Sequence, residues 1–174
     1  MSQSIAVFGS AFNPPSLGHL SVLKRLSRFD RVLLLPSYAH AWGKVMLDYD
    51  ARCELVSAFI EDSGQANLEL CRIEETMAVG DEAITTYAVL TELQKQIPDA
   101  ELTFVIGPDN LASFHKFYKA DAITASWQVL ACPETLKIRS TLIRDKLAGS
   151  CSVSQLTTPK VATMLMEDPR FKFG

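Results

Sequence analysis

A histidine, a lysine and an arginine stand in three separate segments of this chain where a phosphate group could be bound and reacted. The histidine is His19, which ends the segment GSAFNPPSLGH at residues 9–19. Glycine and serine in such a loop leave backbone N–H groups open, and a helix that starts beside them attracts an anion. A histidine there can donate a hydrogen bond to a phosphate and stabilise charge that develops in a transition state. We therefore interpret the segment as a site of phosphate chemistry and not merely as a turn with a capping histidine.

The lysine and the arginine lie in loops further along the chain. Lys44 ends the segment PSYAHAWGK at residues 36–44 and is either a phosphate ligand or an ordinary surface charge. The segment KIRSTLIR at residues 137–144 supplies two arginines, and its Ser140 and Thr141 would cap a helix start with open amides. A basic helix start is common by itself. Together with the histidine loop, it predicts a two-sided clamp for a polyphosphate.

Two further loops carry groups that suit a nucleoside. Gly107 would permit close approach of a ligand, and Asp109 could accept hydrogen bonds from a ribose diol. Phe117 could stack on a base or a pyridine ring, although packing of the same ring against the core is the alternative. Thr85, at a predicted helix start, offers its hydroxyl either to a ligand or to the helix amides.

Short apolar runs alternate with helical patterns and would place these loops at one edge of a sheet. Strands are predicted at 5–8, 31–35, 68–73, 102–106 and 128–132, and helices at 17–28, 51–61, 83–96, 111–125, 141–148 and 159–166. Asp50 is predicted to cap the second helix. The strand runs are almost continuously apolar, as expected when both faces are covered.

This alternation predicts an α/β fold, with a Rossmann-like, doubly wound, parallel five-stranded sheet, helices on both faces and a small C-terminal helical segment. Ligands bind beyond the carboxyl ends of the strands in such a fold, which is where the loops described above lie. No linker or repeat interrupts the pattern, so we expect one domain over residues 1–174.

Composition narrows the class of protein further. A formal net charge of −3 gives no basic footprint for extended nucleic-acid binding. The 4 cysteines have neither CxxC spacing nor nearby histidines, which predicts reduced, mostly buried thiols. No segment approaches the roughly 20 apolar residues of a membrane helix, and the N-terminus does not resemble a signal peptide. We expect a cytoplasmic protein, with a homo-oligomer left open.

With these segments assembled, the chain resembles the nucleotidyltransferase superfamily that carries a (H/T)xGH loop and an ISSTxxR helix start. It is most similar to the nicotinate/nicotinamide-mononucleotide adenylyltransferases, over nearly its full length. GSAFNPPSLGH matches the first motif and IRSTLIR the second. In four places the chain departs from the family. Ser16 stands where the family has His or Thr, Arg139 replaces the first Ser of ISST, Phe117 occupies a tryptophan position, and residues 133–136 form a shortened connection.

The resemblance implies adenylyl transfer from ATP to nicotinate or nicotinamide mononucleotide in NAD biosynthesis, with release of pyrophosphate. ATP and a pyridine mononucleotide would be the partners, and Mg²⁺ would be carried by the ATP phosphates without protein side-chain ligands. The implied catalytic residues are His19, Lys44 and Arg144. The implied binding residues are Gly9, Ser10, Phe12, Ser16, Gly18, His19, Lys44, Thr85, Gly107, Asp109, Phe117, Ser140, Thr141 and Arg144.

Two other functions stay open on the same fold. One is adenylyl transfer to a pantetheine phosphate, since those enzymes are also short. The other is a non-catalytic nucleotide-binding or sensing domain, which the departures from the family pattern suggest.

Overall fold

A parallel five-stranded sheet forms the centre of the molecule. The computed structural model describes residues 2–39, 46–80 and 82–173, and its strands are β1 (Ser4–Ser10), β2 (Arg31–Pro36), β3 (Leu68–Leu70), β4 (Glu101–Ile106) and β5 (Gln128–Ala131). Their order is β3-β2-β1-β4-β5, and every neighbouring pair is parallel. The predicted doubly wound sheet is confirmed. Its order reverses beside β1, which lies between β2 and β4, and the ligand crevice of such sheets opens at this point.

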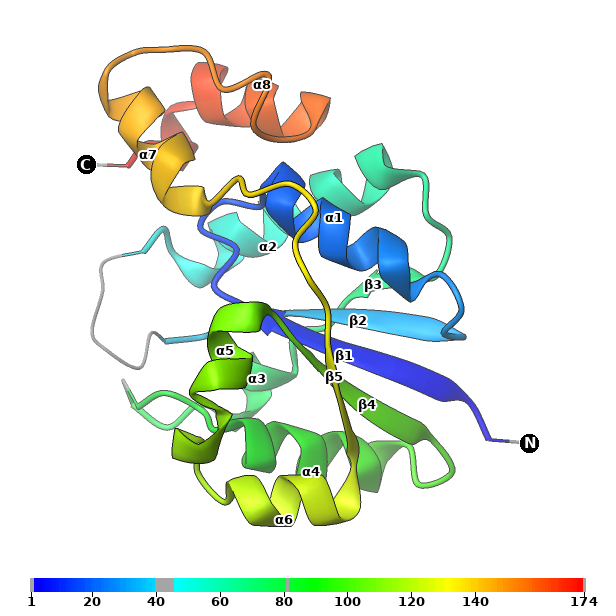
Figure 1. Cartoon of the computed structure of the whole chain (residues 1–174). Helices are drawn as coiled ribbons and strands as arrows, with labels where there is room; N and C mark the ends of the chain where they lie inside the picture. Colours follow the sequence, from blue (N-terminus) through cyan, green and yellow to red (C-terminus); the bar gives the residue numbers. More distant parts are fainter. Residues whose placement is uncertain (1, 40–45, 81, 174) are drawn as a thin grey trace.

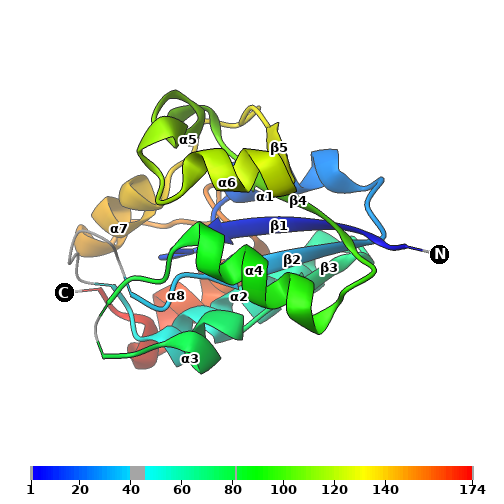
Figure 2. The same cartoon turned by 90° about the horizontal axis from the view of Figure 1, so that it is seen from below.

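Helices cover both faces of the sheet. They are α1 (Leu17–Leu23), α2 (Tyr49–Ser63), α3 (Ile73–Met77), α4 (Thr86–Gln96), α5 (Pro108–Ala112), α6 (Ala120–Ser126), α7 (Ser140–Ala148) and α8 (Pro159–Glu167), with 3₁₀ turns at Lys24–Leu26, Phe114–Lys116 and Pro169–Phe171. Figure 1 shows α1 and α2 above the sheet and α4 and α6 below it, and Figure 2 gives the view from the α4 side. Ala6 and Phe8 of β1 are buried on the first face, and Ile5 and Val7 on the second. Burial on both faces explains the continuous apolar runs of the strands.

The C-terminal helices α7 and α8 lie on the same side of the sheet as α1 and α2 (Figure 1). Ile143, Val161 and Phe171 are fully buried in the apolar cluster of that face. The predicted C-terminal helical segment is therefore packed on the core. This packing brings the start of α7 beside the loop that follows β1, where Ser140 Oγ donates a hydrogen bond to the carbonyl oxygen of Pro14 at 2.6 Å.

The predicted helix over residues 111–125 is wrong in its middle. α5 ends at Ala112, and α6 does not begin until Ala120. Lys119 adopts a left-handed backbone conformation with φ of 55°, which interrupts a right-handed helix. Just before it, Phe117 turns inward and packs against Phe104 of β4, with 6.2 Å between the ring centroids. The break in the helix therefore allows the ring of Phe117 to pack against the sheet.

The start of α2 and the end of β3 also differ from the prediction. Asp48, and not Asp50, caps α2, because its carboxylate accepts a hydrogen bond from the amide of Ala51 at 2.7 Å. The predicted strand at 68–73 ends at Leu70, because the next apolar residue begins the short helix α3. Ile73, the first residue of α3, is buried in the same apolar cluster as Leu33 of β2 and Leu90 of α4, so a strand and a short helix leave the same apolar pattern in the sequence.

The cysteines are free thiols that differ in exposure. Cys53 and Cys132 are buried, Cys71 is half-buried and Cys151 is exposed. Within the described ranges, no helix is both long enough and apolar enough to cross a membrane.

Candidate active site

The loop after β1 holds His19 in one defined orientation. Ser16 caps α1, and its Oγ accepts a hydrogen bond from the amide of His19 at 3.3 Å. In return, the amide of Ser16 donates to Nδ1 of His19 at 3.0 Å. Because Nδ1 accepts an N–H hydrogen bond, the proton of the neutral ring resides on Nε2. Nε2 lies 3.1 Å from Oγ of Ser10, at the carboxyl end of β1, so the histidine offers a fixed N–H donor at this edge.

Aromatic packing keeps this imidazole neutral. The ring lies beside Phe12, with 4.8 Å between centroids, and edge-on to Phe8 at 6.3 Å. Burial lowers the pKa of His19 to about 4, because the charged ring loses its hydration. A neutral ring can offer an anion only an uncharged N–H hydrogen bond. Since Nδ1 is already occupied, the geometry fits a donor of hydrogen bonds better than a base.

The two predicted phosphate motifs are tied together by hydrogen bonds across the sequence. Ser16 Oγ lies 3.0 Å from the carbonyl oxygen of Ile138, to which it donates. Arg144 Nη1 donates to the carbonyl of Asn13 at 2.8 Å, and the Ser140 contact described above completes the set. The structure thus brings the segment 9–19 and the segment 137–144 side by side, as the two-sided clamp requires.

The resemblance implies Gly18 as a nucleotide-binding residue, but in the structure Gly18 permits the close contact between the two motif segments. A side chain at this position would overlap the carbonyl oxygen of Ile138 and lie 3.2 Å from that of Leu136. The space that the absent side chain leaves is therefore filled by the chain's own backbone. Gly18 is needed for close packing of the two motif segments.

A first cavity of about 470 Å³ opens where β1 and β4 end. Its walls include six of the predicted binding residues besides the histidine, namely Gly9, Ser10, Ser16, Gly107, Asp109 and Ser140. The N-terminus of α7 contributes open amides and the positive end of the helix dipole. The cavity therefore combines hydroxyl groups, open amides and a carboxylate, which are groups that could bind phosphate and ribose.

A second cavity of about 480 Å³ lies on the other side of the end of β1. The two cavities share Gly9, Ser10, Phe104 and Asn110, so they meet at the end of the strand. The predicted aromatic residue Phe117 lines the second cavity. Two ligands bound in these cavities would therefore face each other across the loop that carries the histidine.

Thr85 does not line either cavity. Its hydroxyl accepts a hydrogen bond from the amide of Ala88 at 3.2 Å and caps α4, so the capping alternative applies. The next residue, Thr86, lines the second cavity. The sequence alone does not indicate which of two adjacent threonines caps the helix and which faces the cavity.

Phe12, Thr141 and Arg144 do not line either cavity. Phe12 is fully buried against the ring of His19, so it supports the histidine and does not face a ligand. Thr141 is exposed, and its Oγ1 accepts a hydrogen bond from Arg144 Nη2 at 3.1 Å. Arg144 itself is held by the Asn13 carbonyl. Lys44 lies outside the described residues.

Two buried charged residues beside the second cavity, Arg52 and Glu74, were not among the predicted binding residues, and Glu74 also lines this cavity. Arg52 is 1% exposed and donates hydrogen bonds to the carbonyls of Ala11, Ser37 and Leu47 at 2.9, 2.7 and 2.8 Å. Glu74 of α3 is also buried and accepts a hydrogen bond from the amide of Tyr38 at 3.3 Å. Burial raises the pKa of Glu74 to about 7. These residues anchor the loops after β1 and β2.

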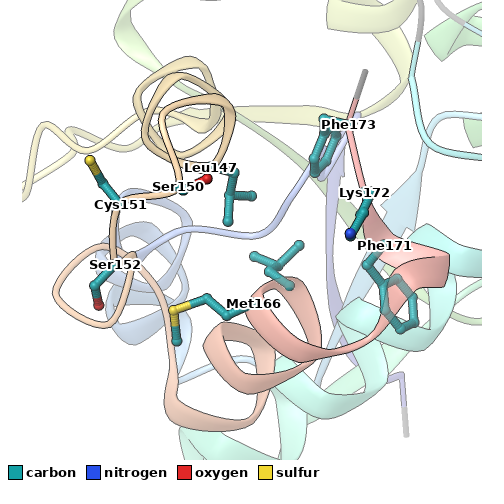
Figure 3. Close-up of a pocket in the computed structure, with 9 residues that line it drawn as sticks. Leu147, Ser150, Cys151, Ser152, Met166, Phe171, Lys172 and Phe173 are labelled. Atoms are coloured by element: carbon teal, nitrogen blue, oxygen red, sulfur yellow. The ribbon is translucent and has the colours of Figure 1, made fainter.

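A third cavity, of about 490 Å³, lies away from these residues. Figure 3 shows it between the end of α7, the loop at 150–152, α8 and the C-terminal segment. Leu147, Met166 and Phe173 contribute apolar walls, and none of the predicted site residues lines it. Its polar side chains, Ser150, Ser152 and Lys172, belong to neither of the two phosphate motifs.

A parallel α/β sheet whose β1 loop and α7 start converge on one cavity at its switch point defines a nucleotide-binding α/β protein. The class can be narrowed, because a family profile matches residues 7–146. The chain belongs to the cytidylyltransferase-like family and is a nucleotidyltransferase.

Named relatives agree with this assignment. A probable nicotinate-nucleotide adenylyltransferase of Myxococcus xanthus is 30% identical over 94% of this chain and 92% of its own. The crystal structure of a proposed nicotinate-nucleotide adenylyltransferase from Vibrio parahaemolyticus aligns with a TM-score of 0.86 and 47% identity, over 99% of this chain and 97% of that one. Plasmodium falciparum nicotinic acid mononucleotide adenylyltransferase, complexed with NaAD, shares the fold at a TM-score of 0.79 and 14% identity, over 99% and 98% of the two chains. The resemblance seen in the motifs is confirmed.

Proposed function

We propose that the protein transfers the adenylyl group of ATP to nicotinate mononucleotide, with nicotinamide mononucleotide as the alternative acceptor. The observation that carries this proposal is the position of the His19 Nε2–H beside Ser10, where the two cavities meet. The names of the relatives support the pyridine mononucleotide as the acceptor. The dinucleotide product would place the new phosphoanhydride bond beside the histidine.

In the proposed reaction, an oxygen of the acceptor's 5′-phosphate attacks the α-phosphorus of ATP. The bond from that phosphorus to the bridging oxygen of the β-phosphate breaks, and pyrophosphate leaves with the electron pair. A phosphate monoester is already ionised and nucleophilic, so the step needs no general base. Positioning and charge stabilisation remain as the tasks of the protein.

His19 suits the second of these tasks. Its Nε2–H would donate to a non-bridging oxygen of the α-phosphate, where negative charge increases in the transition state. Because Ser16 fixes the tautomer and the ring packs on Phe12, the donor needs no reorganisation during the reaction. The low pKa of the imidazole keeps the ring neutral at neutral pH, so the donor would be an uncharged N–H group.

The first cavity is assigned to ATP and the second to the acceptor. Ser140 and the open amides of α7 would bind the β- and γ-phosphates, together with Thr141, Arg144 and, as a prediction from the sequence, Lys44. Mg²⁺ would enter as part of the MgATP substrate. Gly107 and Asp109 would hold the ribose, and in the second cavity the ring of Phe117 offers a face for the pyridine.

An acceptor panel tests this function. Pyrophosphate release is measured with MgATP and, in separate reactions, nicotinate mononucleotide, nicotinamide mononucleotide and 4′-phosphopantetheine. We expect release with a pyridine mononucleotide only. Release with 4′-phosphopantetheine alone would assign the protein to the other transferase class. Calorimetric binding of ATP without release for any acceptor would instead favour a sensing domain.

A further inference from the structure

Arg139 connects the two walls of the first cavity. It directly precedes α7, and its Nη1 lies 2.8 Å from Oδ2 of Asp109 in α5. Both residues line the cavity that contains Ser10 and His19. The ion pair therefore spans the space assigned to the nucleotide.

Helix stability does not explain an arginine at this position. Arg139 occupies the N-cap of α7 but makes no side-chain hydrogen bond to the helix amides. A serine, which the ISSTxxR pattern has at the same place, would cap them. In addition, a cation at a helix N-terminus is disfavoured by the helix dipole. The chain thus carries a residue that weakens the helix start, at the point where a polyphosphate would bind.

The ion pair with Asp109 does not explain the arginine at this position either. The two side chains are 59% and 71% exposed, and exposed pairs of this kind contribute little to stability. A guanidinium that is held so weakly can exchange a carboxylate for a phosphate, to which it donates two parallel hydrogen bonds. The same exchange releases the Asp109 carboxylate toward the ribose hydroxyls.

We propose that Arg139 binds the β- or γ-phosphate of ATP, and that its ion pair with Asp109 opens when the nucleotide enters. The identity of the nucleotide rests on the proposed function. Two residues that are paired in the free protein would then contact different parts of the bound nucleotide, Arg139 the polyphosphate and Asp109 the ribose. Arg139 is in this way a residue that distinguishes a nucleoside triphosphate from a monophosphate.

Calorimetric titration with ATP and with AMP, in Mg²⁺ and without an acceptor, tests this assignment. We expect R139S to weaken ATP binding by about 10- to 100-fold, the range for loss of a charge-assisted hydrogen bond, and to leave AMP binding unchanged. R139K should give an intermediate loss. D109N should weaken ATP and AMP binding equally, because both ligands carry the ribose that Asp109 would hold.

A matched control removes a different exposed, ion-paired arginine. R170S deletes the guanidinium that pairs with Asp168 and Glu54 at the C-terminal end of the chain, and ATP affinity should not change. An R139S variant that binds ATP as tightly as the wild type would overturn the proposal. Equal losses for ATP and AMP would overturn it as well, because Arg139 would then act on the ribose through Asp109.

Failure of this inference can be told apart from failure of the proposed function. If R139S lowers ATP affinity as expected but no mononucleotide supports pyrophosphate release, the proposed function fails and the role of Arg139 stands. If release occurs and ATP affinity is insensitive to R139S, only the role of Arg139 fails. A wild-type protein that does not bind ATP would overturn both.

Discussion

The two cavities at the carboxyl edge of the sheet are held together in different ways. On the nucleotide side, side chains of the two motifs reach across the sequence, as in the hydrogen bonds from Ser16 to Ile138 and from Ser140 to Pro14. On the acceptor side, a single buried guanidinium, that of Arg52, gathers carbonyl groups from both loops. The first arrangement needs particular residue types at fixed spacing. The second requires one arginine and leaves the loop residues free to vary.

This difference explains why the first cavity is recognisable in the sequence and the second is not. The walls of the first cavity include residues of the two motifs. These residues must both line the cavity and hold the two motif segments together. The walls of the acceptor cavity are positioned through backbone carbonyls, which every residue provides. If the second cavity holds the acceptor, as proposed, loop substitutions there could change acceptor preference and leave the motif residues in place.

The largest expected effect comes from removing the His19 donor, which lines the first cavity beside Ser10, where the two cavities meet. H19A is expected to lower the rate of pyrophosphate release by about 10²–10³-fold, the usual consequence of losing one preorganised donor at a developing charge. The measurement is the turnover number with saturating MgATP and nicotinate mononucleotide, beside a circular dichroism spectrum and a thermal melt. H115A, at an exposed histidine in the turn after α5, is the matched control and should keep wild-type turnover. Wild-type turnover in H19A would remove the histidine from the mechanism.

A substitution of Arg52 tests whether its buried guanidinium holds the loops around the second cavity. R52M keeps the volume of the side chain but leaves the carbonyls of Ala11, Ser37 and Leu47 without their buried donor. We expect the free energy of unfolding to fall by roughly 3 kcal/mol, since each unsatisfied buried group costs about 1–3 kcal/mol and the loops will relax in part. Urea unfolding at neutral pH measures this loss. R28M, at an exposed arginine, should change it by less than about 0.5 kcal/mol, and an equally small change in R52M would contradict the scaffold role.

Glu74 makes the acceptor side sensitive to pH. The charged or titratable groups that face it are Arg52 and Tyr49 from α2 and Cys71 from the segment before α3. Burial raises the pKa of the Glu74 carboxyl from 4.5 to about 7, so the folded protein holds a proton that the unfolded chain releases between these values. Stability from this group is therefore present at low pH, falls as pH rises toward 7, and is constant above it.

E74Q, which does not titrate, isolates this contribution. The stability of E74Q relative to the wild type should increase by roughly 1–3 kcal/mol between pH 5 and pH 7.5. Urea unfolding of both proteins across that range provides the measurement. E167Q removes an exposed carboxylate at the end of α8 and serves as the control. A difference between E74Q and wild type that does not vary with pH would show that the carboxyl is ionised throughout.

The sequence predicted what depends on side-chain chemistry and on apolar period. The strands and the pairing of the His19 loop with the start of α7 could be predicted, because apolar runs and motif residues mark them directly. The buried position of Arg52 could not be predicted, since its partners are backbone carbonyl groups that leave no pattern in the sequence. Glu74 and its neighbour Glu75 are both acidic, yet only the first is buried. Tertiary packing alone separates them.

The smallest expected effect tests the contact between the two motif segments. Gly18 lies inside α1, where alanine favours a helix by about 1 kcal/mol over glycine, so helix propensity alone predicts that G18A is stabilising. The new methyl group would instead overlap the Ile138 carbonyl, and strain of this kind costs about 1–3 kcal/mol. We expect a net loss of roughly 1 kcal/mol in the free energy of unfolding, with weaker ATP binding because the start of α7 is displaced.

The matched control for G18A is G149A at the other end of α7, where the nearest atom to a new Cβ lies at an ordinary 3.7 Å. Thermal melts and ATP titration of the two variants separate strain at the motif contact from a general response to a glycine substitution. A stabilised G18A with unchanged ATP affinity would mean that the 136–138 segment moves away at little cost. The nucleotide side would then be as adaptable as the acceptor side, and the contrast between the two cavities would not hold.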